Sequence, residues 1–374
     1  MPAGRGLFRP ALAGLLPYEP GKPVEEVQRE LGLDRVVKLA SNEGPYGPFQ
    51  AALEAMARVA PELNRYPDGG AWALRRSLAA LHSVRLEEIA VGAGADGLID
   101  CLSQALLDPG DEVVLGWPSF PSYLIDAVKC GAIPVRVPLR DHRYDLDGLL
   151  AAVTPRTKIV YVCHPNNPTG TCNSRVELDA YFERVPEHVL TVLDQAYFEY
   201  IDDPDYADGV ADYFRAGRQV IVLRTFSKIY GLAGLRVGYG IGPAEVVTEA
   251  AKVRRAFDLG ATAQAAALAS LGGDDGGELE RRRRENAEGR VRVEKEIRGH
   301  GFEPVGPAVA NFVYVEVGED SRPLFEQLLR QGVIVRPLAG FGAPGAIRVT
   351  VGTAAENERF GVALGSVLAG AASS

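Results

Sequence analysis

A lysine follows shortly after an apolar run in the stretch Thr225-Phe226-Ser227-Lys228-Ile229-Tyr230-Gly231-Leu232-Ala233-Gly234-Leu235-Arg236-Val237-Gly238. The run, residues 219–223, has the composition of a buried strand in a parallel sheet. Open α/β sheets bind ligands at the carboxyl ends of their strands, and Lys228 falls at such an end. The stretch therefore predicts a ligand pocket on a parallel sheet.

Lys228 is predicted to be the nucleophile of this pocket. A lysine amine in a dry, positively charged pocket has a lowered pKa and forms a Schiff base with an aldehyde. A solvated loop lysine is the alternative for any single lysine. Here Thr225 and Ser227 precede it and Arg236 follows, and these side chains are suited to a phosphate. The leading hypothesis is that Lys228 holds pyridoxal 5'-phosphate (PLP), with Thr225, Ser227 and Arg236 at the phosphate.

The composition excludes several classes of protein. A net charge of -9 over 374 residues gives no general electrostatic reason to bind nucleic acid or an anionic membrane. The basic run 281–284 is flanked by glutamates, so we expect it on the solvated face of a helix. No apolar segment approaches the ~20 residues of a membrane span, and residues 1–9 show no export signal. The scattered cysteines and histidines predict neither a disulfide nor a metal site, so we expect a cytoplasmic protein.

The order of apolar runs predicts an α/β fold. Strands alternating with helices are expected at residues 89–91, 112–116, 133–137, 158–163, 189–193, 219–223 and 237–241. Such an alternation forms a large domain with a seven-stranded, mostly parallel sheet. After residue 243, helices and short strands at 311–317, 333–335 and 347–351 predict a smaller α+β domain. We expect residues 1–36 to join the small domain, 37–243 to form the large domain, and 244–374 to supply interdomain helices and the small C-terminal domain.

Two motifs suggest how the large domain holds the rest of the cofactor. Gly94-Ala95-Asp96 opens a helix, whose free N–H groups and positive dipole end attract a phosphate. Phe120 follows a strand and is placed to stack on a flat heteroaromatic ring, although a buried phenylalanine is often plain core. Both motifs agree with PLP and neither would identify it alone.

Polar residues after two further strands supply partners for the ring. Asn167 follows the strand that ends at residue 163 and is expected to donate toward a phenolic oxygen. Asp194 ends the strand 189–193, where a buried carboxylate requires a cation. A protonated pyridine nitrogen meets this need and makes the ring an electron sink. The alternative for Asp194 is the N-cap of the next helix. Tyr197 is expected to donate to the ring's phenolate.

Together these motifs resemble the class I/II aminotransferases of PLP fold type I, over nearly the whole chain and in that family's order. The resemblance rests on residues 165–170, 194–197 and 227–238. Residues 39–48, 64–68, 332–338 and 347–353 are most similar to the histidinol-phosphate aminotransferase branch of that family.

The resemblance implies a role for further residues. Lys228 would both bind the cofactor and shuttle a proton. Tyr66 would reach the PLP phosphate of a neighbouring subunit, so that a homodimer completes each site. Arg348 and Arg336 would bind the anionic group of the substrate. Asn42 and Tyr46 lie in the loop 38–48, which is either a lip over the pocket with substrate contacts or a connector.

The implied reaction is transamination between histidinol phosphate and 2-oxoglutarate in histidine biosynthesis. An aromatic amino acid aminotransferase is the alternative within this chemistry, and a PLP-dependent decarboxylase of a phosphorylated amino acid is a further one. A PLP-sensing regulator would need a DNA-binding domain, which residues 1–36 do not resemble. Two departures from the family pattern are Gly44, where many members have asparagine, and Ala95, where serine is frequent. The first weakens the prediction of substrate.

Overall fold

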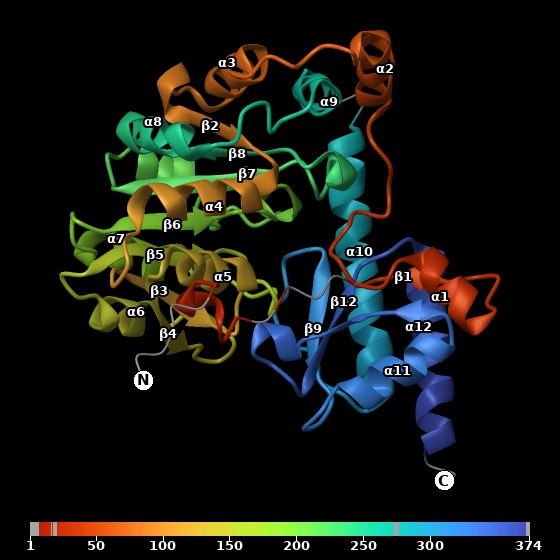
Figure 1. The fold of residues 1–374 in the computed structure, drawn as a ribbon. Coiled ribbons are helices and arrows are strands. Elements are labelled where there is room, and N and C mark those ends of the chain that lie inside the picture. The colour runs from red at the N-terminus through yellow and green to blue at the C-terminus, as the bar shows by residue number, and fades with distance from the viewer. Residues whose placement is uncertain (1–6, 16, 18–20, 273–276, 372–374) are drawn as a thin grey trace.

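The computed structural model describes residues 7–15, 17, 21–272 and 277–371, and its larger part is a twisted sheet covered by helices (Figure 1). Its seven strands lie in the order β2-β8-β7-β6-β5-β3-β4; β8 is antiparallel to both neighbours and the other pairs are parallel. The strands are β2 (Ile89–Gly92), β3 (Glu112–Trp117), β4 (Ile133–Pro138), β5 (Thr157–Cys163), β6 (Leu190–Asp194), β7 (Val220–Thr225) and β8 (Gly238–Ile241). The predicted fold class is confirmed.

Helices pack around the large sheet, and its central strands are buried. They are α2 (Gln50–Val59), α3 (Trp72–His82), α4 (Gly94–Leu106), α5 (Pro121–Cys130), α6 (Leu146–Ala152), α7 (Arg175–Arg184), α8 (Ala244–Val253) and α9 (Ala261–Leu271). Every residue of β6 and β7 is buried, which explains why these strands were recognisable as apolar runs. Within the described ranges, no helix has both the length and the apolar character of a membrane span.

The smaller part has its own sheets and core. Its elements are α1 (Val24–Leu31), β1 (Val37–Lys38), α10 (Glu278–Gly299), β9 (Phe312–Glu316), α11 (Arg322–Arg330), β10 (Val333–Ile334), β11 (Arg336–Pro337), β12 (Ala346–Thr350) and α12 (Ala354–Ala371). Strands β11-β12-β9 form an antiparallel sheet, and β1 pairs with β10 in parallel. A separate buried cluster around Val293, Val349 and Phe360 forms the core of this part. Helices α8 and α9, however, pack into the core of the large sheet.

One strand and one charged run differ from expectation. The strand β11 was not predicted, because two residues ending in a proline show no alternation and proline donates nothing to a ladder. The basic run on α10 was expected to be solvated, and this is wrong for Arg282, which is only 5% exposed. Its charge is satisfied by Glu278 at 2.7 Å and by backbone carbonyls, which is how a buried guanidinium is tolerated.

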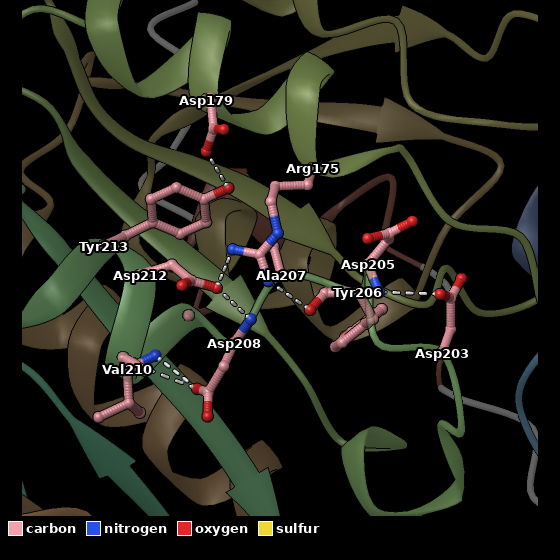
Figure 2. A network of polar contacts seen from close by, with 12 residues as sticks. Arg175, Asp179, Asp203, Asp205, Tyr206, Ala207, Asp208, Val210, Asp212 and Tyr213 are labelled. Atoms are coloured by element: carbon pink, nitrogen blue, oxygen red, sulfur yellow. Dashed lines mark hydrogen bonds and ion pairs between the residues drawn. The ribbon is translucent and has the colours of Figure 1, made fainter.

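A polar network ties the chain beyond β6 to α7 (Figure 2). Arg175 of α7 forms an ion pair with Asp212 at 2.5 Å and donates to the Tyr206 carbonyl at 2.9 Å. Gln195, the residue after β6, donates to the Ala207 carbonyl at 2.8 Å. The network holds Tyr206 and Gln195 holds Ala207, so these adjacent residues connect α7 with the end of β6.

Candidate active site

Most of the residues that the sequence predicted line one cavity of about 150 Å³. It lies at the carboxyl ends of β5, β6 and β7, as expected for an open α/β sheet. Its lining consists of Ser41, Asn42, Ala95, Asp96, Ile99, Phe120, Cys163, Asn167, Asp194, Ala196, Tyr197, Thr225, Ser227, Lys228, Arg236, Phe341 and Arg348. Folding thus brings together residues that are up to 307 positions apart, from Ser41 to Arg348.

Asp194 is buried at the end of β6 and its carboxylate is held in place. One oxygen accepts from the Tyr123 hydroxyl at 2.6 Å and the other from the Ala196 N–H at 3.0 Å. Burial raises the pKa of Asp194, and the hydrogen bonds from Tyr123 and Ala196 oppose the rise. The carboxylate does not cap the following 3₁₀ helix, whose N-cap is Tyr197. A cationic partner in the cavity is the arrangement that this buried acid requires.

Tyr123 is a site residue that the sequence did not reveal. It lies within α5, fully buried, and stacks on Tyr161 at 4.3 Å between ring centres. An aromatic residue at this place in a helix has the pattern of ordinary core. Its hydroxyl became recognisable only through its contact with Asp194.

Lys228 lines the same cavity, and the pKa of its amine is lowered. Its Nζ is 3.4 Å from the Ser41 carbonyl and 5.6 Å from the centre of the Tyr197 ring. Burial and, after it, the positive charge of Arg348 lower the pKa of Lys228 to about 7, while Glu43 opposes the shift. A large share of this amine is therefore neutral and nucleophilic near pH 7.

Tyr197 is oriented by the loop that precedes α2. Asn42 donates from its amide to the Tyr197 hydroxyl at 2.9 Å, and its own N–H donates to the Thr350 hydroxyl at 3.0 Å. Asn42 was expected to contact substrate; it lines the cavity and also links the loop, Tyr197 and β12.

Hydroxyls, a guanidinium and a helix end converge at another part of the cavity. Thr225 donates to Ser227 at 3.0 Å, and Arg236 donates to the same Ser227 hydroxyl at 3.3 Å. Gly94, with φ of 80°, begins α4 beside them, and a Cβ there would lie 2.6 Å from the Arg236 Nη2 atom. Gly94 itself is outside the lining, but its small size lets Arg236 reach the helix N-terminus, which makes a site for an anion.

Arg348 brings a positive charge from the smaller part of the molecule. It donates to the Ala40 carbonyl at 2.8 Å and to the Asn167 side-chain oxygen. Asn167 therefore accepts from Arg348 through its oxygen, which leaves its amide nitrogen to act as a donor. Arg336 stands directly opposite Arg348 on β11 but does not line the cavity.

Besides Gly94 and Arg336, two more predicted residues lie outside the cavity lining, Tyr46 and Tyr66. Tyr46 was expected at the substrate, but its hydroxyl donates to Glu285 and its ring faces Arg281, 4.8 Å from the ring centre. The reason is that α10 offers a carboxylate and guanidiniums on that side of the loop. Tyr66 is 81% exposed and stacks on Phe257, with ring centres 4.5 Å apart.

We expect the pH at which Lys228 reacts with an aldehyde to depend on the positive charge of Arg348. In protein freed of cofactor, covalent capture of PLP at Lys228 should rise as the pH increases through about 7, because the amine is protonated below its lowered pKa. Arg348→Met removes a charge that lowers this pKa, so its midpoint should move upward toward 10.5. Borohydride reduction and peptide mass spectrometry at a series of pH values measure the midpoint.

The control for this prediction is Arg336→Met. Arg336 is the cross-strand neighbour of Arg348 but lies outside the cavity, so its loss should move the midpoint less. Equal shifts of the midpoint in the two variants, or no shift in Arg348→Met, would contradict the conclusion that the charge of Arg348 lowers the pKa of Lys228.

Comparison with known proteins agrees with this geometry. Residues 34–364 match the family model described as aminotransferase class I and II. A histidinol-phosphate aminotransferase of Moorella thermoacetica is 44% identical over 96% of this chain and 93% of its own. A histidinol-phosphate aminotransferase of Sinorhizobium meliloti, solved in complex with pyridoxal-5'-phosphate, superposes with a TM-score of 0.88 at 30% identity, covering 98% of each chain. An aspartate aminotransferase mutant of Thermus thermophilus reaches 0.84 at 27% identity, covering 98% of this chain and 99% of that one.

These matches confirm the resemblance on which the expected fold and activity rested. The family match covers most of the chain, and the cavity with Lys228 and Asp194 lies within the matched residues. This chain belongs to the aminotransferases of class I and II.

Proposed function

We propose that this aminotransferase moves the amino group of histidinol phosphate to 2-oxoglutarate, using the residues of the cavity around Lys228. The observation that carries the proposal is that the perturbed amine of Lys228, the buried acid Asp194 and the cationic Arg348 line one cavity. Relatives that share 42–45% of their sequence with this chain are named histidinol-phosphate aminotransferases, which supports the choice of substrate.

PLP is the cofactor, and the residues of the cavity fit its three functional parts. Lys228 suits the aldehyde, because its amine is neutral near pH 7. Asp194 suits the ring nitrogen, because a buried carboxylate needs a cation. Thr225, Ser227 and Arg236 suit the phosphate together with the N-terminus of α4. When bound, PLP supplies the carbonyl that takes up an amino group and the ring that accepts electrons from the substrate's Cα.

Each polar residue of the cavity has a task in the proposed reaction. Lys228 would hold the cofactor through its amine, and the same amine, when free, would take the proton from the substrate's Cα. Asp194 would face the ring nitrogen and hold a proton on it, and Tyr123 and the Ala196 N–H orient its two oxygens. Tyr197, oriented by Asn42, would donate a hydrogen bond to the cofactor's phenolic oxygen.

The anionic end of the substrate is assigned to Arg348, with Arg336 behind it. Arg348 reaches the cavity and Arg336 faces it in register across the sheet, so two guanidiniums are concentrated at this end. Like charges on directly opposite residues repel each other, and a bound dianion would offset that cost. Guanidinium forks match the oxygens of a phosphate, which favours histidinol phosphate over a donor with a single carboxylate.

We propose that the enzyme is a homodimer whose sites are shared. Tyr66 is largely exposed and outside the cavity of its own chain, although its family motif assigns it to a PLP phosphate. A second copy related by a two-fold axis would receive this hydroxyl and return its own. We further propose a cytoplasmic location, which the four free cysteines support because unpaired thiols persist in a reducing compartment.

Half-reactions of the purified holoenzyme test the substrate. Histidinol phosphate should convert the cofactor to its amino form at least about tenfold faster than phenylalanine at equal concentration, since each 1.4 kcal/mol of extra binding is worth a factor of ten. Glutamate should also convert it, because 2-oxoglutarate is the proposed acceptor. Absorbance in a stopped-flow instrument follows each conversion.

The other candidate activities give different results in the same assay. Conversion with phenylalanine but not with histidinol phosphate would replace the proposed substrate with an aromatic amino acid. Release of CO2 without a keto acid would instead indicate a decarboxylase.

A further inference from the structure

Arg282 lies where three segments of the chain meet. It is near the N-terminal end of α10 and is buried. Its Nε donates to Glu278 at 2.7 Å, its Nη1 to the Ile229 carbonyl at 2.9 Å, and its Nη2 to the Gly47 carbonyl at 2.9 Å. The guanidinium carbon also stands 4.4 Å from the centre of the Phe49 ring. With every nitrogen engaged, this planar group has one orientation.

The two carbonyls belong to two backbone segments that carry residues of the active site. Ile229 follows Lys228 directly, and Gly47 lies at the end of the loop that carries Asn42. These stretches touch, because a Cβ added at Gly231 would lie 2.5 Å from the Gly47 oxygen. Arg282 therefore bridges two backbone segments that are packed directly on each other.

We propose that Arg282 is a positioning residue of the transamination site, which fixes the Lys228 backbone against the loop 38–48 through its bridge from Ile229 to Gly47. The proposal rests on the proposed function. Arg282 does not line the cavity, so it acts through the two segments that it joins. One segment carries the amine of Lys228, and the other carries Asn42, which orients Tyr197.

Other residues of α10 extend this connection. Arg283 donates to the Glu199 carbonyl at 2.9 Å, two residues beyond Tyr197. Further along the helix, Arg290 donates to the Ala310 carbonyl at 3.1 Å, just before β9. One helix thus contacts the segments of Lys228 and Tyr197 at one end and the sheet that carries Arg348 beyond. Among these arginines, Arg282 is the one that bonds both to the loop, at Gly47, and to the residue after Lys228, Ile229.

The test replaces Arg282 in the full-length holoenzyme. Arg282→Met removes the donors to both carbonyls and to Glu278, and Arg282→Lys keeps the charge but cannot reproduce the planar bridge. We expect kcat to fall about 10- to 100-fold in both variants, as for a displacement of about 1 Å, with KM for histidinol phosphate within about threefold because no cavity-lining group changes. Arg281→Met is the matched control, since Arg281 also pairs with Glu278 and faces Tyr46 without reaching a site carbonyl.

A second measurement separates positioning from stability. In protein freed of PLP, the pH midpoint of cofactor capture at Lys228 should rise in both Arg282 variants and stay near 7 in Arg281→Met. The charges that set this midpoint are Arg348, Glu43, Arg236 and Asp194, so a shift caused by Arg282 would report a moved lysine. The urea midpoint of unfolding is measured on the same samples.

Two results would overturn the proposal. The first is a lower urea midpoint with unchanged kcat per bound cofactor and an unchanged capture midpoint, which would make Arg282 structural. The second is full recovery of kcat in Arg282→Lys, which would make charge sufficient. If Arg282→Met does not fold, Arg282→Lys carries the test. Failure of the proposed function itself would appear separately, as a wild-type enzyme that does not convert histidinol phosphate.

Discussion

Lys228→Ala is expected to lower the rate of transamination by at least about 10³-fold, because one substitution removes both the nucleophile and the general base. The lowered pKa of Lys228 and its place in the cavity with Asp194 are the grounds for this expectation. Single-turnover conversion of the cofactor by histidinol phosphate measures the effect. Far-UV circular dichroism checks that the variant is folded.

A mixing experiment is the control for Lys228→Ala, and it also examines the proposed shared site. Lys228→Ala and Tyr66→Ala chains, each of low activity alone, should regain about a quarter of wild-type activity when reassociated at random, since half the dimers are mixed and each has one intact site. No recovery from verified mixed dimers would argue that Tyr66 serves its own chain. Near-normal activity of Lys228→Ala alone would reject the proposed mechanism.

Asp194→Asn is expected to lower kcat by about 10²- to 10³-fold, the effect of losing roughly 3–4 kcal/mol from a buried charge interaction. An amide cannot hold a proton on the ring nitrogen, so the ring would accept electrons less readily from the substrate's Cα. The rate of the half-reaction with saturating histidinol phosphate is the measurement.

Tyr123→Phe is a milder variant for comparison with Asp194→Asn. It leaves the acid in place and removes the 2.6 Å hydrogen bond that orients it. We expect a loss of about tenfold, in line with one hydrogen bond to a charged group. A larger loss in Tyr123→Phe than in Asp194→Asn would contradict the proposed order, in which the carboxylate acts and the tyrosine orients.

The large sheet could be predicted because its physics is local. Each buried strand is a short apolar run, and each is followed by a turn or a helix start that the chain shows directly. The main polar residues of the cavity stand at those strand ends, so Asp194, Asn167 and Lys228 were recognised from their positions alone. In a parallel sheet the carboxyl ends of the strands lie along one edge, so residues that follow different strands come close together in space.

Other features depend on contacts between distant parts of the chain. Tyr123 looked like helix core until its hydroxyl met Asp194, and Arg282 looked solvated until the carbonyls of Ile229 and Gly47 enclosed it. Tyr46 turned to Glu285 rather than to the cavity because α10 packs beside its loop.

The sequence by itself determined the fold class, the cofactor and the residues at the strand ends. Only the tertiary structure decided which polar groups hold those residues in place. The physical reason is that a strand or a helix start is specified by neighbours along the chain, whereas a buried polar side chain takes whichever partner folding brings within hydrogen-bond distance.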